Sequence, residues 1–306
     1  MGIFGKKGEP ERQDRDGRNL PTTIFMSPGL KVLEGFREDS ALSEPIVRLT
    51  KILRERFGLG RGDTVTLKKG SALVKARVEV SSAADGREEA CRLNRAARDI
   101  LGAALGDQIE IVPPETLILL IDTSGSMGDF ISGLVKIDAT KNAVREFIRS
   151  KFLMGQEDRA GIISFGEYAT VVEKPTTDYE HLENRAATLF ANGATAMHEG
   201  MGLAIDQLSY TGGMKRIVLL TDGVPTTTGR QAVLSLAKKA ATLRIVIDTV
   251  GVGSPFDFMG YDEALLKKIA AITGGTFRRV IDIQELTGQF RELAEGKNYT
   301  YLLPGK

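Results

Sequence analysis

The sequence predicts a two-domain protein in which a small β-barrel precedes an α/β domain with a doubly wound, mostly parallel six-stranded sheet. From residue 116 onward, short apolar strands alternate with helical segments, a pattern typical of a parallel sheet covered by helices on both faces. Between residues 30 and 113 the chain instead contains two copies of one unit. Two copies are too few for a solenoid, so we expect them to close on each other as a barrel.

The composition is that of an ordinary soluble globular protein, with 42% hydrophobic and 26% charged residues among 306. A formal net charge of +1 provides no field that would recruit nucleic acid or an acidic membrane. The longest apolar runs, about five residues, are far too short to cross a membrane. Cys91 is the single cysteine, which excludes an internal disulfide and fits a reducing compartment. We therefore expect a cytoplasmic protein that binds neither nucleic acid nor membranes.

The chain divides into four segments. Residues 1–28 mix both signs of charge with glycine and proline and are interpreted as a flexible arm. The barrel domain spans 29–113 and the α/β domain 114–300, followed by a tail at 301–306. The two domains meet at "VPPE" (112–115), whose paired prolines favour an extended, stiff linker.

The internal repeat is visible when "IVRLTKILRERFGLGRGDTVTL" (46–67) is set over "ACRLNRAARDILGAALGDQIEI" (90–111). Asp107 matches Asp63 at an offset of 44 residues, and upstream "LKVLEGF" falls on "VKARVEV" at the same offset. Each unit predicts a strand, a loop, a strand, a short helix, a Gly-Asp turn and a strand. Thr50 and Asn94 are the expected N-caps of the two helices.

This half resembles the double-psi β-barrel in the N-terminal domain of valosin-type AAA+ ATPases. The matching pieces, within residues 30–113, are "LKVLEGF", "IVRL", "GLGRGDTVTL", "CRLNRAARDIL" and "LGDQIEI". In that family a second small barrel follows and adaptors bind between the two, whereas here "VPPE" follows at once. The resemblance therefore implies a protein-binding barrel in general terms, or a structural spacer, without a specific adaptor site.

The second half predicts alternating elements. The residues "SFGEYATVVEK" predict a tight turn between neighbouring strands, so the strand after this turn is expected to be an antiparallel edge. Strands are expected at 116–121, 159–165, 169–173, 215–221, 244–250 and 276–281. Helices are expected near 134–151, 181–190, 198–209, 229–243, 262–273 and 283–295.

Small polar side chains follow the first of these strands. Asp122 ends the strand, and Ser124 and Ser126 lie on the loop that follows. In doubly wound sheets, ligands bind beyond the carboxyl ends of the strands, at the point where strand order reverses. Two further oxygens occur in similar positions: Thr195 in the glycine-containing loop "NGATAM", and Asp222 at the end of "VLLTD".

Hydroxyl and carboxylate oxygens suit a hard cation such as Mg²⁺, with Mn²⁺ as a possible substitute. These oxygens need no sulfur or imidazole ligand, which argues against zinc. The predicted metal site consists of Asp122, Ser124, Ser126, Thr195 and Asp222. The alternative is a hydrogen-bonded loop cluster without metal.

These residues resemble the metal ion-dependent adhesion site of the von Willebrand factor A domain. The pieces, in family order across about residues 115–295, are "LILLIDTSGSM", "DRAGIISFG", "NGATAMHEGM", "IVLLTDGVP", "IDTVGVG" and "LLKKIAAITGGTF". The resemblance implies that Ser124 and Ser126 bind the metal through their hydroxyls and that Thr195 binds directly when a partner is engaged. It also implies that Asp122 and Asp222 mostly hold metal-bound water, which leaves one position for an acidic side chain of a partner protein.

We therefore expect an interaction protein without catalytic activity. Intracellular members of the family often work beside AAA+ ATPases, so the resemblance implies an ATPase-linked adaptor role. The alternative is a Mg²⁺-dependent hydrolase or phosphatase, because Asp122 after a strand is similar to the nucleophile of haloacid dehalogenase-type phosphatases. Their second acid is replaced here by Ser124, and neither a phosphate-binding loop nor a nucleophile elbow is present in the sequence.

Overall fold

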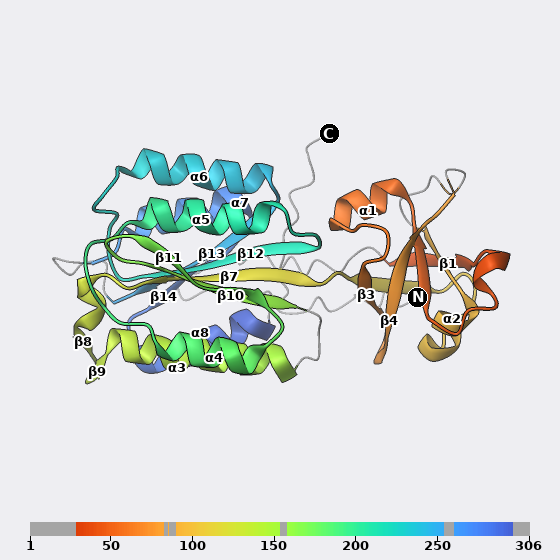
Figure 1. Cartoon of the computed structure of the whole chain (residues 1–306), viewed down its shortest axis with the longest axis horizontal. Helices are drawn as coiled ribbons and strands as arrows, with labels where there is room; N and C mark the ends of the chain where they lie inside the picture. The colour runs from red at the N-terminus through yellow and green to blue at the C-terminus, as the bar shows by residue number, and fades with distance from the viewer. Residues whose placement is uncertain (1–28, 83–84, 86–89, 154–157, 254–259, 296–306) are drawn as a thin grey trace, which may run out of the picture.

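The computed structural model describes residues 29–82, 85, 90–153, 158–253 and 260–295. The arm expected at 1–28 and the tail at 301–306 lie outside these residues. Figure 1 shows a β-rich N-terminal part joined through strand β7 to a layered α/β part. No helix among the described residues combines the length and the apolar character needed to span a membrane.

Six strands of the N-terminal half form a closed barrel in the order β1-β5-β2-β4-β3-β6. The first unit contributes β1–β3 and the second β4–β6, and every neighbouring pair in the barrel joins one unit to the other. The barrel predicted from the repeat is thus confirmed as closed. The strands are β1 (Leu30–Glu34), β2 (Ile46–Leu49), β3 (Thr64–Lys69), β4 (Ala72–Val80), β5 (Ala90–Leu93) and β6 (Gln108–Val112).

The two short helices of the barrel occupy equivalent places. Thr50 caps α1 (Lys51–Phe57) by accepting the N–H of Leu53, and Asn94 caps α2 (Arg95–Leu101) by accepting that of Ala97. Both helices end at a glycine in the left-handed conformation, Gly58 (φ 65°) and Gly102 (φ 61°). Both caps that the sequence predicted are confirmed.

The expected offset of 44 residues is wrong for the first strand of each unit. The N–H of Val32 bonds Asp107 O (2.8 Å), and the N–H of Val78 bonds Asp63 O (2.7 Å). Asp63 and Asp107 keep the offset of 44, so Val32 and Val78 are equivalent at an offset of 46. The connection after β1 is two residues longer than the one after β4, which the ungapped comparison missed.

The α/β half has one six-stranded sheet in the order β11-β10-β7-β12-β13-β14. All neighbours are parallel except β10 and β11, so the expected antiparallel edge strand is confirmed. Its strands are β7 (Glu115–Asp122), β10 (Arg159–Phe165), β11 (Ala169–Thr176), β12 (Met214–Thr221), β13 (Ile245–Val252) and β14 (Phe277–Val280).

Helices cover both faces of this sheet, as expected for buried parallel strands (Figure 1). On one face lie α3 (Lys136–Leu153), α4 (Tyr179–Ala187) and α8 (Ile283–Glu295). On the other lie α5 (Met197–Ser209), α6 (Arg230–Thr242) and α7 (Glu263–Thr273). All eight residues of β7 are buried, so the central strand separates two apolar cores.

A small hairpin was not expected from the sequence. Strands β8 (Phe130–Ile131) and β9 (Leu134–Val135) pair between the first loop of the α/β domain and α3. Ser132 (φ 49°) and Gly133 (φ 83°) form its turn, and two successive positive φ values match the tight turn that twisted hairpins favour. The hairpin therefore projects immediately beside the predicted site loop.

Candidate functional site

Three connections meet at the carboxyl edge of the sheet. Strand β7 has β10 on one side and β12 on the other, so the strand order reverses at β7. Asp122 ends β7, and Asp222 follows β12 directly. Backbone hydrogen bonds tie the loops together: Gly125 N–H to Gly193 O (2.9 Å), and Asn192 N–H to Thr123 O (2.7 Å).

Asp122 is fully buried, and hydrogen bonds engage both of its carboxylate oxygens. Oδ1 accepts the backbone N–H of Ser124 (2.8 Å), and Oδ2 accepts the hydroxyl of Thr221 (2.5 Å). Burial, followed by the charge of nearby Asp222, raises the pKa of Asp122 to about 7 against the bonds that favour its ionised form. Asp122 thus fixes the start of the loop, because its carboxylate is hydrogen-bonded both to Thr221 on the neighbouring strand and to the backbone of Ser124 in the loop.

A continuous chain of side-chain contacts joins the next three residues. Ser124 Oγ lies 3.1 Å from Ser126 Oγ, and Ser126 donates its hydroxyl to Asp222 Oδ1 (2.8 Å). The second oxygen of Asp222 accepts a hydrogen bond from Lys136 Nζ at 2.7 Å. Asp222 is fully buried, whereas the Lys136 side chain is 15% exposed. The predicted hydroxyls and carboxylates therefore lie together, accompanied by one ammonium group.

Thr195 joins the cluster from the loop before α5. Its N–H bonds Thr226 Oγ1 (3.0 Å), and its carbonyl accepts the N–H of Thr226 (3.2 Å). The Thr195 hydroxyl stands 3.5 Å from where a Cβ on Gly223 would lie, next to Asp222. A Cβ on Gly223 would be in ordinary van der Waals contact with this hydroxyl, so the Thr195 hydroxyl lies close to the backbone beside Asp222.

The donor set fits a hard cation. Three hydroxyls and two carboxylates are the oxygens that Mg²⁺ prefers. Within the described part of the chain, no group of three or more His, Cys, Asp or Glu side chains could hold a metal. A metal at this edge would therefore depend on the hydroxyls, and the nitrogen and sulfur ligands of a zinc site are not gathered there.

Besides Thr221, which bonds Asp122, Lys136 is the member of the cluster that motif spacing did not identify. It is the first residue of α3, ten positions after Ser126, and the β8–β9 hairpin lies between them. A cation at the start of the helix is unfavourable with respect to the helix dipole, which is a signal that could have drawn attention to it. The buried carboxylate of Asp222 offsets that cost.

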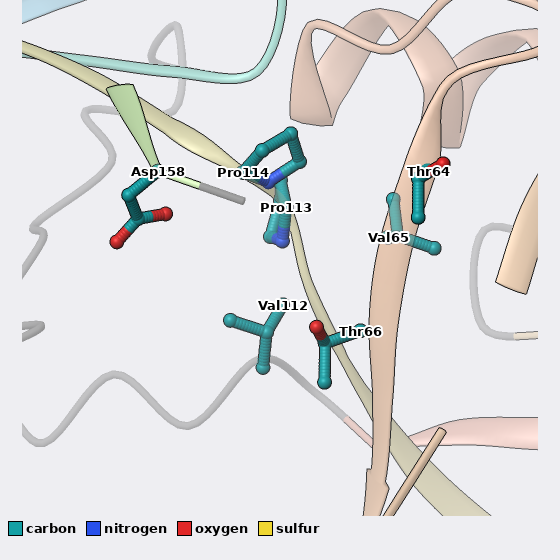
Figure 2. A pocket seen from close by; sticks show the side chains of 7 residues that line it. All are labelled: Thr64, Val65, Thr66, Val112, Pro113, Pro114 and Asp158. Carbon is teal, nitrogen blue, oxygen red and sulfur yellow. The ribbon is translucent and has the colours of Figure 1, made fainter. Parts of the chain in front are cut away.

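A small cavity at the opposite end of the sheet is not a second candidate (Figure 2). Its volume of about 10 Å³ is room for one water molecule. The nearby Asp158 carboxylate is already held by Lys151 Nζ (3.0 Å) and by the N–H of Glu115 (2.9 Å). The lining, where barrel and α/β domain meet, consists of Thr64, Val65, Thr66, Val112, Pro113, Pro114 and Asp158.

Comparison with protein families identifies a von Willebrand factor type A domain at residues 117–224. Among curated proteins, an uncharacterized protein of Borreliella burgdorferi is 28% identical over 54% of this chain and 54% of its own length. A UPF0353 protein of Mycolicibacterium paratuberculosis is 26% identical over 60% of each chain. This chain thus spans between half and two thirds of the length of these relatives.

Two solved structures are similar to the α/β part. A von Willebrand factor type A protein from Catenulispora acidiphila matches 60% of this chain and 42% of its own, with a TM-score of 0.52 and 23% identity. The vWF domain of the type V pilus tip protein Mfa5 from Porphyromonas gingivalis matches 63% and 98%, with a TM-score of 0.51 and 14% identity. At such identities the likeness establishes the fold alone.

Proposed function

We propose that this protein, whose C-terminal half is a von Willebrand factor A-type domain, is a metal-dependent interaction protein that captures a carboxylate of a protein partner. The observation that carries the proposal is the oxygen cluster at the switch point of the sheet. Ser124, Ser126 and Asp222 lie in one chain of contacts, and Asp122 holds its first loop. The motif order of the sequence, which resembles the adhesion-type metal site, supports the same interpretation.

The hydroxyls of Ser124, Ser126 and Thr195 would hold Mg²⁺, with Asp122 and Asp222 supporting it through water or through the hydroxyls. A bound Mg²⁺ supplies a positively charged, Lewis-acidic position that an external carboxylate can occupy. The residues of the chain hold the ligand oxygens in place before any partner arrives, because each loop is fixed by backbone hydrogen bonds to its neighbour.

Charge explains why the expected ligand is an anion. The Asp222 carboxylate is already paired with Lys136, and the hydroxyl ligands are neutral. Asp122, with a pKa of about 7, contributes one negative charge at most. A divalent cation therefore leaves the site with a net positive charge, and a carboxylate of a partner would neutralise it.

We infer a protein-binding role for the barrel as well. Its resemblance to the N-terminal barrel of valosin-type ATPases and its closed six-stranded sheet support a double-psi topology and a place beside an AAA+ ATPase. A direct test is whether the isolated barrel and the full chain bind a purified ATPase of that type from the same organism. Failure of both to bind would remove this part of the proposal and leave the metal site untouched.

The metal site is tested by calorimetric titration of the full chain with Mg²⁺ and Mn²⁺. Asp122→Ala and Ser126→Ala should each weaken binding by about tenfold or more, since each removes an oxygen or its support. Asp138→Ala is the matched control, because Asp138 is an exposed carboxylate in the first turn of α3. Equal affinity in the wild type and Asp122→Ala would rule out the site.

Hydrolysis is the competing function, and the geometry disfavours it. A nucleophilic carboxylate needs an accessible oxygen, whereas Asp122 is fully buried with both oxygens engaged. Assays with p-nitrophenyl phosphate and p-nitrophenyl acetate in Mg²⁺ should show no turnover. Turnover that Asp122→Asn abolishes would favour the hydrolase instead.

A further inference from the structure

Exposed large apolar side chains of the α/β domain concentrate at the edge of the sheet that carries the oxygen cluster. Among its described residues seven such side chains are exposed, and six lie on connections at the carboxyl edge. Tyr210, at the end of α5, is the one at the opposite edge. Five of the six lie on the connections that carry or contact the proposed metal site, and we name them the apolar rim: Phe130, Leu134, Tyr168, Phe190 and Val224.

Two members of the rim lie on the hairpin between Ser126 and Lys136. Phe130 belongs to β8 and Leu134 to β9, so a tight hairpin holds both between two residues of the oxygen cluster. The N–H of Lys136 bonds Asp129 O (3.0 Å), which closes the base of the hairpin. Phe130 is 74% exposed in this position.

The other three are held by the neighbouring loops. Val224 follows Asp222 by two positions. Phe190 precedes Asn192 by two positions, and the Asn192 N–H bonds Thr123 O (2.7 Å). The Tyr168 carbonyl accepts the N–H of Gly166 (3.2 Å), and the Gly166 carbonyl accepts that of Ala196 (2.9 Å), the residue after Thr195. Every rim residue is therefore within a few positions of a residue tied to the site.

This distribution differs from the usual scatter of single exposed apolar residues. Phe130, Tyr168 and Phe190 are aromatic and 70–74% exposed, which leaves most of each ring in water. Aromatic side chains around a central polar anchor are characteristic of protein-binding surfaces. The anchor here is cationic once a metal is present, because Lys136 already pairs with Asp222, the carboxylate that accepts the Ser126 hydroxyl.

We propose that the apolar rim selects a partner segment in which an Asp or Glu is flanked by aromatic or large aliphatic residues. The carboxylate occupies the centre and its apolar neighbours cover the rim. This inference rests on the proposed function and deepens it, because it names what must surround the acidic residue. Burying even one aromatic ring on the rim should strengthen binding by about tenfold relative to an acidic segment without apolar neighbours.

The test is a selection from a random peptide display library on the full chain, in Mg²⁺ and in EDTA. Selection in Mg²⁺ should enrich an acidic residue with apolar residues within a few positions. Phe130→Ser/Phe190→Ser should still enrich the acidic residue but lose the apolar neighbours. Tyr210→Ser is the matched control, since it removes an exposed aromatic ring at the other edge, and it should select like the wild type.

The outcomes separate the two proposals. If the wild type enriched acidic residues without apolar neighbours, the proposed selection by the apolar rim would be wrong, and the proposed metal-dependent capture of a carboxylate would be unaffected. Enrichment of apolar residues alone, unchanged in EDTA, would overturn the carboxylate capture. No enrichment at all would overturn both.

Synthetic peptides provide the quantitative check. An enriched peptide, its Asp→Asn form and a form with serine in place of the apolar neighbours are titrated into the wild type and Phe190→Ser. The serine form should lose about tenfold in affinity for the wild type but little for Phe190→Ser. Equal losses on both proteins would contradict a contact with Phe190. Mg²⁺ titration of Phe190→Ser should match the wild type, which shows that the metal site is intact.

Discussion

Lys136 is the residue on which the electrostatics of the cluster depend most directly. Asp222 has one oxygen bonded to Ser126 and the other to Lys136, so a metal-bound water at the second oxygen would lie beside the ammonium group. An incoming cation must compete with the ammonium group for the second oxygen. The same ammonium group stabilises the protein without metal, because a buried carboxylate without a partner is strongly destabilising.

Lys136→Met should therefore change metal binding and stability in opposite directions. We expect tighter Mg²⁺ binding and a loss of unfolding free energy on the order of 3 kcal/mol without metal. Calorimetry measures the affinity, and urea unfolding in EDTA and in Mg²⁺ measures the stability. Lys141→Met is the control, since Lys141 pairs with exposed Asp138 on the same helix (3.1 Å). Weaker Mg²⁺ binding by Lys136→Met would contradict the competition.

At this scale, strand-end position and side-chain chemistry were enough to select Ser124, Ser126 and Asp222, which the structure brings into contact, and Asp122, which holds their loop. Lys136 could not be selected in this way, since its Nζ reaches Asp222 across 86 positions of sequence. The buried ion pairs that Lys151 makes with Glu115 and Asp158 could not be selected from the sequence either. Only the folding of α3 beside the first residues of β7 and β10 brings Lys151 to these two carboxylates.

Among the elements, the barrel shows how a repeat can interleave its copies. Strand β1 pairs with β5 and β6, β2 with β4 and β5, and β3 with β4 and β6. A single unit thus contains no strand pair of the barrel. Neither copy can satisfy its backbone hydrogen bonds alone.

A fragment of residues 29–113 should fold cooperatively, whereas residues 29–70 should not. The shorter fragment keeps α1 and three strands but loses every barrel partner of those strands. Circular dichroism and urea titration of both fragments provide the measurement. A cooperative transition from 29–70 alone would show that one unit has a core of its own.

Element boundaries followed from local signals where those signals exist. The four inner strands of the sheet carry Ile, Val and Leu runs, and α4 and α7 begin at the capping aspartates Asp178 and Asp262, so the existence and direction of these elements were predictable. The β8–β9 hairpin was missed because two-residue strands have no periodicity to detect. The two-residue shift of β1 was missed because a loop can lengthen without altering the pattern on either side.

At the scale of the whole molecule, the barrel docks beside the amino edge of the sheet, away from the oxygen cluster (Figure 1). The carbonyl of Gly58, at the end of α1, accepts the N–H of Gly213 (2.8 Å) before β12. The carbonyl of Glu55 accepts a hydrogen bond from Arg244 Nη1 at 2.7 Å. Together with Pro113 and Pro114, these contacts fix the barrel to the sheet at more than one point.

The repeat supplies an internal control for this docking. Gly58 and Gly102 end equivalent helices in the same left-handed conformation, so alanine at either should cost about 1–2 kcal/mol for the backbone. A Cβ on Gly102 would meet nothing within 4 Å, whereas one on Gly58 would lie 2.8 Å from Gly213 O. Only the alanine at residue 58 therefore has to push the two domains apart.

In the full chain, we expect Gly58→Ala to destabilise the barrel more than Gly102→Ala does. In the isolated fragment 29–113, we expect the two substitutions to destabilise the barrel equally. Hydrogen-exchange mass spectrometry distinguishes the barrel strands from the sheet in the full chain, and urea titration gives the free energies for the fragment. Gly58→Ala should also speed exchange around Gly213, which Gly102→Ala should leave unchanged. Equal effects of the two substitutions in the full chain would mean that the contact between Gly58 and Gly213 does not couple the domains. Unequal effects confined to the full chain would mean that the barrel and the α/β domain are held as one body, so that a partner bound by either domain would also be positioned relative to the other.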